Sequence, residues 1–259
     1  MYSIAFDVEL DRLVPESWCE ETVPKITCAA IFSEEKGTKL YYTRYTNNGK
    51  APHLSVQDAA KLCDDLYAHL KRGALIISWG GTAVDFRALY HCLKGDDERQ
   101  RRCAMVTKGH IDIPIASATD IGMMMGLDAA ARGTGQGRKS NSISTNAPRL
   151  WSEGKQNEVL EHVKLDAMLT LRVYNSIMQS IPPSLTWYTR TGNIRTWFCY
   201  FIADYERKMI RLSTVSECLL RPQKPVPFTI PNGMDRDKAV KWLSSIKSYC
   251  DIVKNNTIP

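Results

Sequence analysis

The hydrophobic pattern of the first 80 residues predicts three strands, a helix and a fourth strand. Residues 2–6, 25–32 and 39–45 are rich in β-branched and aromatic side chains, and polar turns separate them, which predicts strands. Residues 55–71 begin with a capping box and continue with an amphipathic repeat that predicts a helix. Residues 74–79 are continuously apolar, as in a central strand that is covered on both faces.

The next hundred residues are mainly helical in pattern. Helical spacing is found at residues 84–93, 97–108 and 115–125. A stretch rich in Gly, Ser, Asn and Thr at 132–146 predicts a loop, and 155–180 predicts the longest helix, which two prolines end. Strands interleaved with helices predict an α/β fold with a mixed central sheet flanked by helices.

The pattern changes beyond residue 183, where short aromatic segments, a proline-rich stretch and a predicted helix near 236–247 follow. We therefore predict two parts in this chain of 259 residues. Residues 1–180 form the main domain, and residues 181–259 form a small C-terminal extension of unknown role.

Composition restricts the location of the protein more than its chemistry. No apolar run approaches the ~20 residues that cross a bilayer, and the N-terminus lacks the core of a signal peptide. The eight cysteines are scattered without a C-x-x-C pair, which is typical of free thiols in a reducing compartment. We expect a cytoplasmic protein with no membrane partner. The formal charge of +6 is compatible with a polyanionic ligand.

Two carboxylates in the first strand segment are the leading chemical signal. Asp7 and Glu9 are two positions apart, so in a strand both side chains project from the same face. Adjacent anions repel unless a cation lies between them, and hard divalent ions prefer oxygen ligands. The alternative interpretation is an ordinary pair of surface charges at the end of a strand.

Two further segments supply acidic residues. Asp85 follows the central strand closely, at the edge where α/β sheets gather their ligands, although it can also be an acid at a helix N-terminus. His162 and Asp166 are four residues apart in the long predicted helix, on the side that carries its apolar residues. A buried carboxylate there needs a partner, which a metal ion or a local hydrogen bond to His162 would provide.

The order and context of these residues resemble the DEDD superfamily of 3′–5′ exonucleases. The likeness covers about residues 1–178 and is greatest to the group similar to the proofreading domains of family-B DNA polymerases. It implies a ribonuclease H-like fold. That group usually has a tyrosine where this chain has His162, and an asparagine where Gly80 stands.

The resemblance also implies a mechanism. Asp7, Glu9, Asp85 and Asp166 would hold two divalent metal ions, Mg²⁺ or Mn²⁺, and His162 would orient or deprotonate the attacking water. The reaction would hydrolyse phosphodiester bonds from the 3′ end of single-stranded DNA or RNA and release nucleoside 5′-monophosphates.

Five more residues are candidates for contacts with substrate. Trp79 and Phe86 could stack on a terminal base, and for Trp79 packing in the core is the alternative. Arg132, Arg138 and Lys139 could form a cationic rim that contacts phosphates, or they could belong to a solvated loop.

Two other functions fit the same residues. One is a ribonuclease H-like module without catalytic activity, which binds nucleic acid or a partner from replication or repair. The other is a nuclease of the same fold that cuts internally. We expect the 3′ end of a single-stranded nucleic acid to be the main partner.

Overall fold

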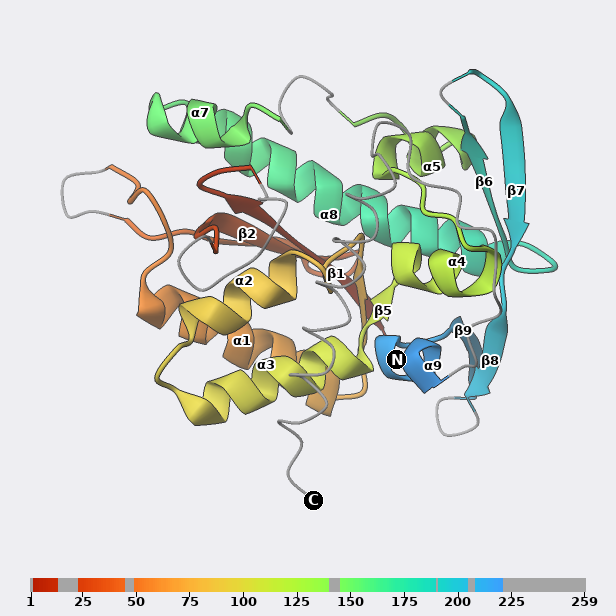
Figure 1. Cartoon of the computed structure of the whole chain (residues 1–259), viewed down its shortest axis with the longest axis horizontal. Helices are drawn as coiled ribbons and strands as arrows, with labels where there is room; N and C mark the ends of the chain where they lie inside the picture. The colour runs from red at the N-terminus through yellow and green to blue at the C-terminus, as the bar shows by residue number, and fades with distance from the viewer. Residues whose placement is uncertain are drawn as a thin grey trace.

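A five-stranded mixed sheet forms the centre of the computed structural model (Figure 1). The structure describes residues 2–13, 23–44, 49–139, 145–189, 191–204 and 208–220. The strands are β1 (Ser3–Leu10), β2 (Ile26–Ser33), β3 (Gly37–Tyr41), β4 (Leu75–Ser78) and β5 (Ile111–Asp112). Their order across the sheet is β3-β2-β1-β4-β5, with β1, β2 and β3 antiparallel in succession and β4 and β5 parallel to β1. The predicted α/β fold with a mixed central sheet flanked by helices is confirmed.

Helices cover the two faces of this sheet. On one face lie α1 (Val56–Lys71), α2 (Asp85–Cys92) and α3 (Asp97–Gly109), and the long helix α8 (Gln156–Gln179) crosses the other face (Figure 1). Alternation along β1 decides which side chains meet each layer, because successive residues of a strand point to opposite faces. Ile4, Phe6, Val8 and Leu10 pack with the α1–α3 layer, whereas Ala5 packs with residues of α8.

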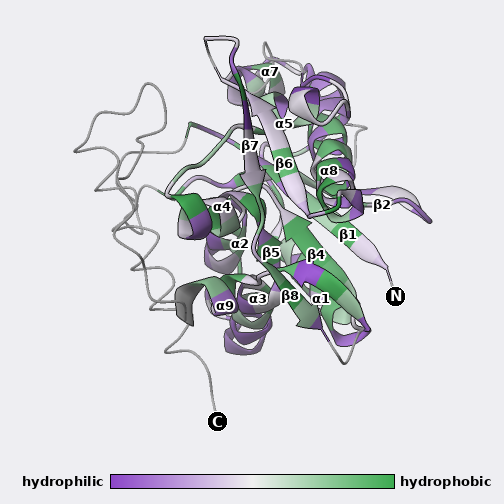
Figure 2. Cartoon of the chain, turned by 90° about the vertical axis from the view of Figure 1, so that its right-hand side faces the viewer, coloured by the Kyte–Doolittle hydropathy of each residue, from purple (hydrophilic) through white to green (hydrophobic). Residues whose placement is uncertain are grey.

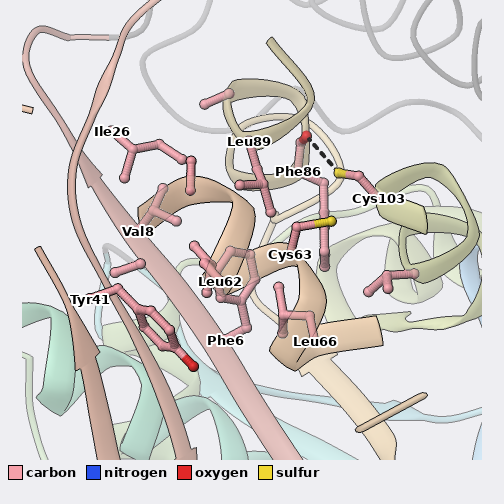
Figure 3. Close-up of a cluster of buried hydrophobic side chains, with 14 of the residues drawn as sticks. Phe6, Val8, Ile26, Tyr41, Leu62, Cys63, Leu66, Phe86, Leu89 and Cys103 are labelled. Carbon is pink, nitrogen blue, oxygen red and sulfur yellow. Dashed lines mark hydrogen bonds between the residues drawn. The ribbon is translucent and has the colours of Figure 1, made fainter. Parts of the chain in front are cut away.

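The core under α1–α3 is built from large apolar side chains and free thiols (Figure 3). Phe6 and Phe86 lie with their ring centroids 5.0 Å apart, and both are fully buried. Cys103 donates a long hydrogen bond of 3.7 Å to the carbonyl of Phe86, which links α3 to α2. This packing fixes the start of α2 beside β1.

Shorter elements complete the described chain. The helices are α4 (Ile113–Ile121), α5 (Leu127–Gly133), α7 (Ala147–Ser152) and α9 (Val215–Leu220). Two hairpins follow α8 and are formed by β6 (Ser184–Tyr188) with β7 (Ile194–Phe198) and by β8 (Phe201–Asp204) with β9 (Met209–Leu212). Figure 2 shows β6, β7 and β8 along the side of the sheet domain that carries α4 and α5.

Several predicted boundaries need correction. The first strand does not end at residue 6 but runs to Leu10, so it carries the two acids within it. The helix expected over 115–125 begins earlier, at Ile113, because the side chain of Asp112 caps it, and it ends at Ile121 before Gly122 with φ 67°. The helix predicted near 236–247 lies outside the described residues.

The residues after 183 share their core with the sheet domain. Leu185, Trp187 and Trp197 are buried in the same cluster as Ile77 of β4 and Leu169 of α8. The backbone N–H of residue 215 also donates to the carbonyl of residue 110, at 2.9 Å. The division at residue 180 stays a prediction. Across the described residues, none of the helices combines the length and the apolar character needed to span a membrane.

A buried ion-pair network holds the second hairpin to α9, and it makes a testable prediction about acid stability. Arg211 bonds to Asp204 at 2.7 Å and to both oxygens of Glu217, at 2.7 and 2.8 Å. Partial burial opposes ionisation of Glu217, but hydrogen bonds from Arg211 and Thr214 outweigh it and lower its pKa to about 2. A lowered carboxyl pKa stabilises the fold above the unfolded value of 4.5, and this stability is lost as the pH falls towards 2.

We therefore expect Glu217→Gln to reduce the free energy of unfolding at pH 7 by about 1–2 kcal/mol, allowing for solvent screening of this partly exposed group. Urea unfolding at several pH values would show the difference from the unsubstituted protein shrinking between pH 4.5 and 2. Glu161→Gln, in an exposed pair with Lys164, is the matched control and should change stability little. A pH-independent effect of Glu217→Gln would contradict the prediction.

Candidate metal centre

Asp7 and Glu9 lie where β1 runs beyond its parallel neighbour. The pairing of β1 with β4 covers Ser3–Ala5, so both acids are further along the strand, towards its carboxyl end. On the other side they are held in register by β2, with Asp7 opposite Ala30 and Glu9 opposite Cys28. They share the face of Ala5, which is covered by α8. The predicted same-face geometry of the two acids is thus present in the strand.

Helix α8 brings His162 and Asp166 to this face. Both side chains are buried, and they are one helical turn apart. The Nε2 atom of His162 lies 3.6 Å from Oε1 of Glu9 and 3.7 Å from Oδ2 of Asp166. One ligand atom from each of Glu9, His162 and Asp166 can be chosen so that all three lie within 4.8 Å of one another. This buried group could hold a metal ion.

Asp85 reaches the same region from a tight turn after β4. The turn passes through Gly80, with φ 80°, and Gly81. A Cβ on Gly81 would lie only 2.6 Å from Oγ of Ser78 and 3.2 Å from Oδ2 of Asp85. Glycine is therefore needed at position 81, because the backbone there runs against the side chains of Ser78 and Asp85. This path lets Asp85 begin α2 with its carboxylate beside the strand.

Asp112 supports this turn, and it belongs to the segment 110–114, whose His and Asp are predicted from the sequence to have a structural role. Its carboxylate accepts hydrogen bonds from the backbone N–H groups of Gly80, at 3.0 Å, and Thr82, at 2.9 Å. Asp112 ends β5, the parallel neighbour of β4, so it lies at the same edge of the sheet as the turn. The side chain is buried and positions the segment that carries Asp85.

The carboxylates make one another costly to ionise. Burial raises the pKa of Asp7, and the Asp166 carboxylate raises it further. Burial also raises the pKa values of Glu9 and Asp85, with Asp7 the next largest cause in both. The ammonium of Lys139 opposes all three shifts. Such a cluster of acids is stabilised by positive charge, whether from a side chain or from a metal ion.

Two buried oxygens fit a metal ion in particular. Oδ2 of Asp85 and Oδ1 of Asp166 have no hydrogen-bond partner among the residues that the structure describes, although both side chains are at least nine-tenths buried. An unsatisfied buried carboxylate oxygen is costly, and a divalent cation would satisfy it. The residues predicted to bind metal therefore fit a site for hard divalent ions.

The aromatic candidates differ from each other. The ring of Phe86 is fully buried between Phe6 and His110, at centroid distances of 5.0 and 4.5 Å. It cannot reach a nucleotide in this position, so the stacking role predicted for Phe86 is corrected to core packing. Trp79 is half-buried against the other core cluster, and its indole N–H donates to the carbonyl of Met125 at 3.1 Å. A contact of Trp79 with substrate stays a prediction.

The three basic candidates also differ in the contacts that they make. Lys139 forms an ion pair with Asp166 and so joins the carboxylates. Arg132 instead pairs with Asp128 at 2.9 Å and lies over the ring of Tyr188, 5.6 Å from its centroid. Arg138 is exposed. Among the three residues of the predicted cationic rim, the described contacts connect Lys139 to the carboxylates. Phosphate contacts by Arg132 and Arg138 stay predictions.

A cavity of about 570 Å³ lies away from these residues, beside α2 and the loop before α1. Its lining is Val23, Pro24, Lys25, Thr43, Ala51, Pro52, His53, Leu54, Ser55, Val56, Ala88, His91, Cys92 and Lys94. This set includes none of the predicted site residues. The chemistry of the chain is therefore inferred from the carboxylates, not from this cavity.

Comparisons with known proteins add little to this geometry. No family model matches the chain, and no curated protein does. Among the solved structures that match is a product-bound structure of exonuclease I, with 12% sequence identity and a TM-score of 0.36, over 100% of this chain and 74% of that chain. A likeness at this level carries no argument about function, which has to be inferred from the side chains themselves.

Proposed function

We propose that this chain is a metal-dependent 3′–5′ exonuclease that hydrolyses single-stranded DNA or RNA and releases nucleoside 5′-monophosphates. The observation that carries the proposal is the grouping of Glu9 from β1 with His162 and Asp166 from α8, together with two buried carboxylate oxygens, on Asp85 and Asp166, that lack partners among the described residues. The same residues, in the same order, carry the resemblance to the DEDD exonucleases.

Asp7, Glu9, Asp85 and Asp166 would hold two ions, Mg²⁺ or Mn²⁺. When bound, such ions supply an activated water and stabilise the charge that develops on the leaving oxygen. The protein contributes position. β1 fixes Asp7 and Glu9 in register, Asp112 fixes the turn before Asp85, and α8 fixes Asp166.

His162 would take the proton from the attacking water. Burial lowers its pKa, which keeps the imidazole neutral near pH 7 and able to accept a proton. Its Nε2 faces the carboxylates of Glu9 and Asp166, which would orient the ring and stabilise the imidazolium that forms.

The proposal predicts a sharp difference between two substrates. With Mn²⁺, a linear single-stranded oligonucleotide should be shortened from its 3′ end, and chromatography should identify the products as nucleoside 5′-monophosphates. A circle of the same sequence should stay intact, because an exonuclease needs an end. EDTA should stop the reaction.

Each other outcome has its own meaning. Cleavage of the circle would identify a nuclease that cuts internally. Absence of mononucleotides from linear DNA and RNA, with Mg²⁺ and with Mn²⁺, would overturn the proposal. A rise in melting temperature with Mn²⁺ but no hydrolysis would indicate the binding module without catalysis.

A further inference from the structure

The loop after α5 carries a lysine into the carboxylate cluster. Gly133, the last residue of α5, lies so close to β6 that a Cβ there would be 2.1 Å from the carbonyl oxygen of Thr186. The chain then turns through Gly135 and Gly137, both with positive φ, of 71° and 122°. The backbone N–H of Lys139 is held by Oδ1 of Asp128 at 3.0 Å. The loop is thus fixed at both ends, and the Lys139 side chain extends from it.

The ammonium of Lys139 occupies the centre of negative charge. It pairs with Oδ2 of Asp166, an oxygen that also faces His162. Burial opposes the charge on Lys139, but Asp166 and Asp7 outweigh it, and the pKa of the ammonium is raised. The side chain is 21% exposed, so it has a path back to solvent.

We propose that Lys139 is a built-in counter-cation, which neutralises the acids in the metal-free protein and must leave Asp166 when divalent ions bind. This rests on the proposed function, because it takes the same carboxylates as the metal site. A Mg²⁺ ion on Oδ1 of Asp166, the oxygen without a partner among the described residues, would lie about 2.0–2.1 Å from that oxygen. It would then be within a few ångströms of the ammonium that pairs with Oδ2 of the same carboxylate. Two cations a few ångströms apart in a poorly solvated site also repel strongly.

The displacement needs only a rotation of the side chain. The anchors of the loop, at Gly133 and at the backbone of Lys139, involve no oxygen of the metal site. Once displaced, Lys139 stays tethered beside the ions, where a phosphate of the substrate would attract it. Lys139 therefore competes with divalent ions for the carboxylates, and this competition lowers the metal affinity of the site.

Mn²⁺ affinity of variants tests the competition directly. Isothermal titration should show that Lys139→Met binds Mn²⁺ about tenfold more tightly than the unsubstituted protein, because the competing cation is gone. Lys139→Arg keeps the charge and should stay within about threefold of the unsubstituted value. Arg138→Met removes the same charge from the neighbouring exposed residue and should also change affinity less than about threefold.

A measurement on the unsubstituted protein avoids the risk that Lys139→Met fails to fold. Brief acetylation with an amine-reactive ester, read by mass spectrometry, should modify Lys139 several-fold faster with Mn²⁺ than without it. Lys164, exposed on α8 and paired with Glu161 at 3.1 Å, is the reference amine and should react equally in both conditions.

The outcomes separate this inference from the proposed function. Unchanged or weaker Mn²⁺ binding by Lys139→Met, or tightening that Arg138→Met reproduces, would overturn the counter-cation while leaving the exonuclease intact. Slower or unchanged acetylation of Lys139 with Mn²⁺ would do the same. Failure of the unsubstituted protein and of Lys139→Met to bind Mn²⁺ would overturn the metal site, and this inference with it.

Discussion

Asp7→Asn is expected to reduce nuclease activity by about 10³-fold or more, while making the metal-free protein more stable. The loss of activity follows because Asp7 is the central strand-borne ligand of the proposed site, and an amide is a much poorer ligand for hard divalent ions. The gain in stability follows from the direction of its pKa shift, which is raised by burial and by Asp166.

The sign of the stability effect can be derived. A carboxyl group whose folded pKa is raised stabilises the fold fully below its unfolded value of 3.8, and this contribution is lost as the pH rises through the folded pKa. At pH 7 the carboxyl of Asp7 therefore costs free energy. The pKa of Asp7 is raised even though the ammonium of Lys139 acts to lower it. Asparagine keeps the shape without the charge and removes that cost.

Thermal melting with EDTA measures the stability of the metal-free protein, and melting with Mn²⁺ measures how much metal binding stabilises it. About 1 kcal/mol moves the midpoint of a domain of this size by about 2–4 °C, which is readily detected. Without metal, Asp7→Asn should melt higher than the unsubstituted protein. The stabilisation by Mn²⁺ should largely disappear.

Asp11→Asn is the control for the same change one residue beyond β1. Asp11 accepts a hydrogen bond from the backbone N–H of Lys25 at 2.9 Å and pairs with Arg12 at 3.1 Å. It is outside the cluster, so its substitution should leave activity and the Mn²⁺ shift unchanged. Retention of full activity or of the full Mn²⁺ shift by Asp7→Asn would exclude Asp7 as a ligand.

Local periodicity predicted the parts of the site that a single element carries. The two-residue spacing of Asp7 and Glu9 and the four-residue spacing of His162 and Asp166 fix which side chains share a face. The apolar run of β4 predicted a central strand, and the acid that follows it was placed at the correct edge. Those inferences need no knowledge of how elements pack.

The remaining features depend on contacts between distant segments. The charges at positions 7 and 9 interrupt the apolar pattern, so the sequence alone ended the strand too early, whereas pairing with β2 continues it to Leu10. Phe86 was predicted to stack on substrate because aromatic rings stack on bases, but in α2 its ring packs into the core. The ion pair of Lys139 depends on the path of a glycine-rich loop, which has no hydrophobic period to read.

His162→Ala is expected to lower the rate about 10²–10⁴-fold, the usual contribution of a general base. The geometry allows two roles, because Nε2 lies at similar distances from Glu9 and Asp166 and could bind an ion or accept a proton. The two roles predict different metal affinities. A general base leaves Mn²⁺ binding within about threefold, whereas the loss of a ligand weakens it about 10-fold or more.

Titration of His162→Ala with Mn²⁺, alongside steady-state rates at saturating metal, therefore decides between the roles. We expect the rate to fall and the affinity to stay, since the four carboxylates already offer enough oxygens for hard ions, which prefer them to imidazole. His69→Ala is the control, because His69 on α1 bonds to Tyr2 at 2.7 Å on the other face of the sheet. An unchanged rate in His162→Ala would leave this histidine as a packing residue between the two acids that it faces.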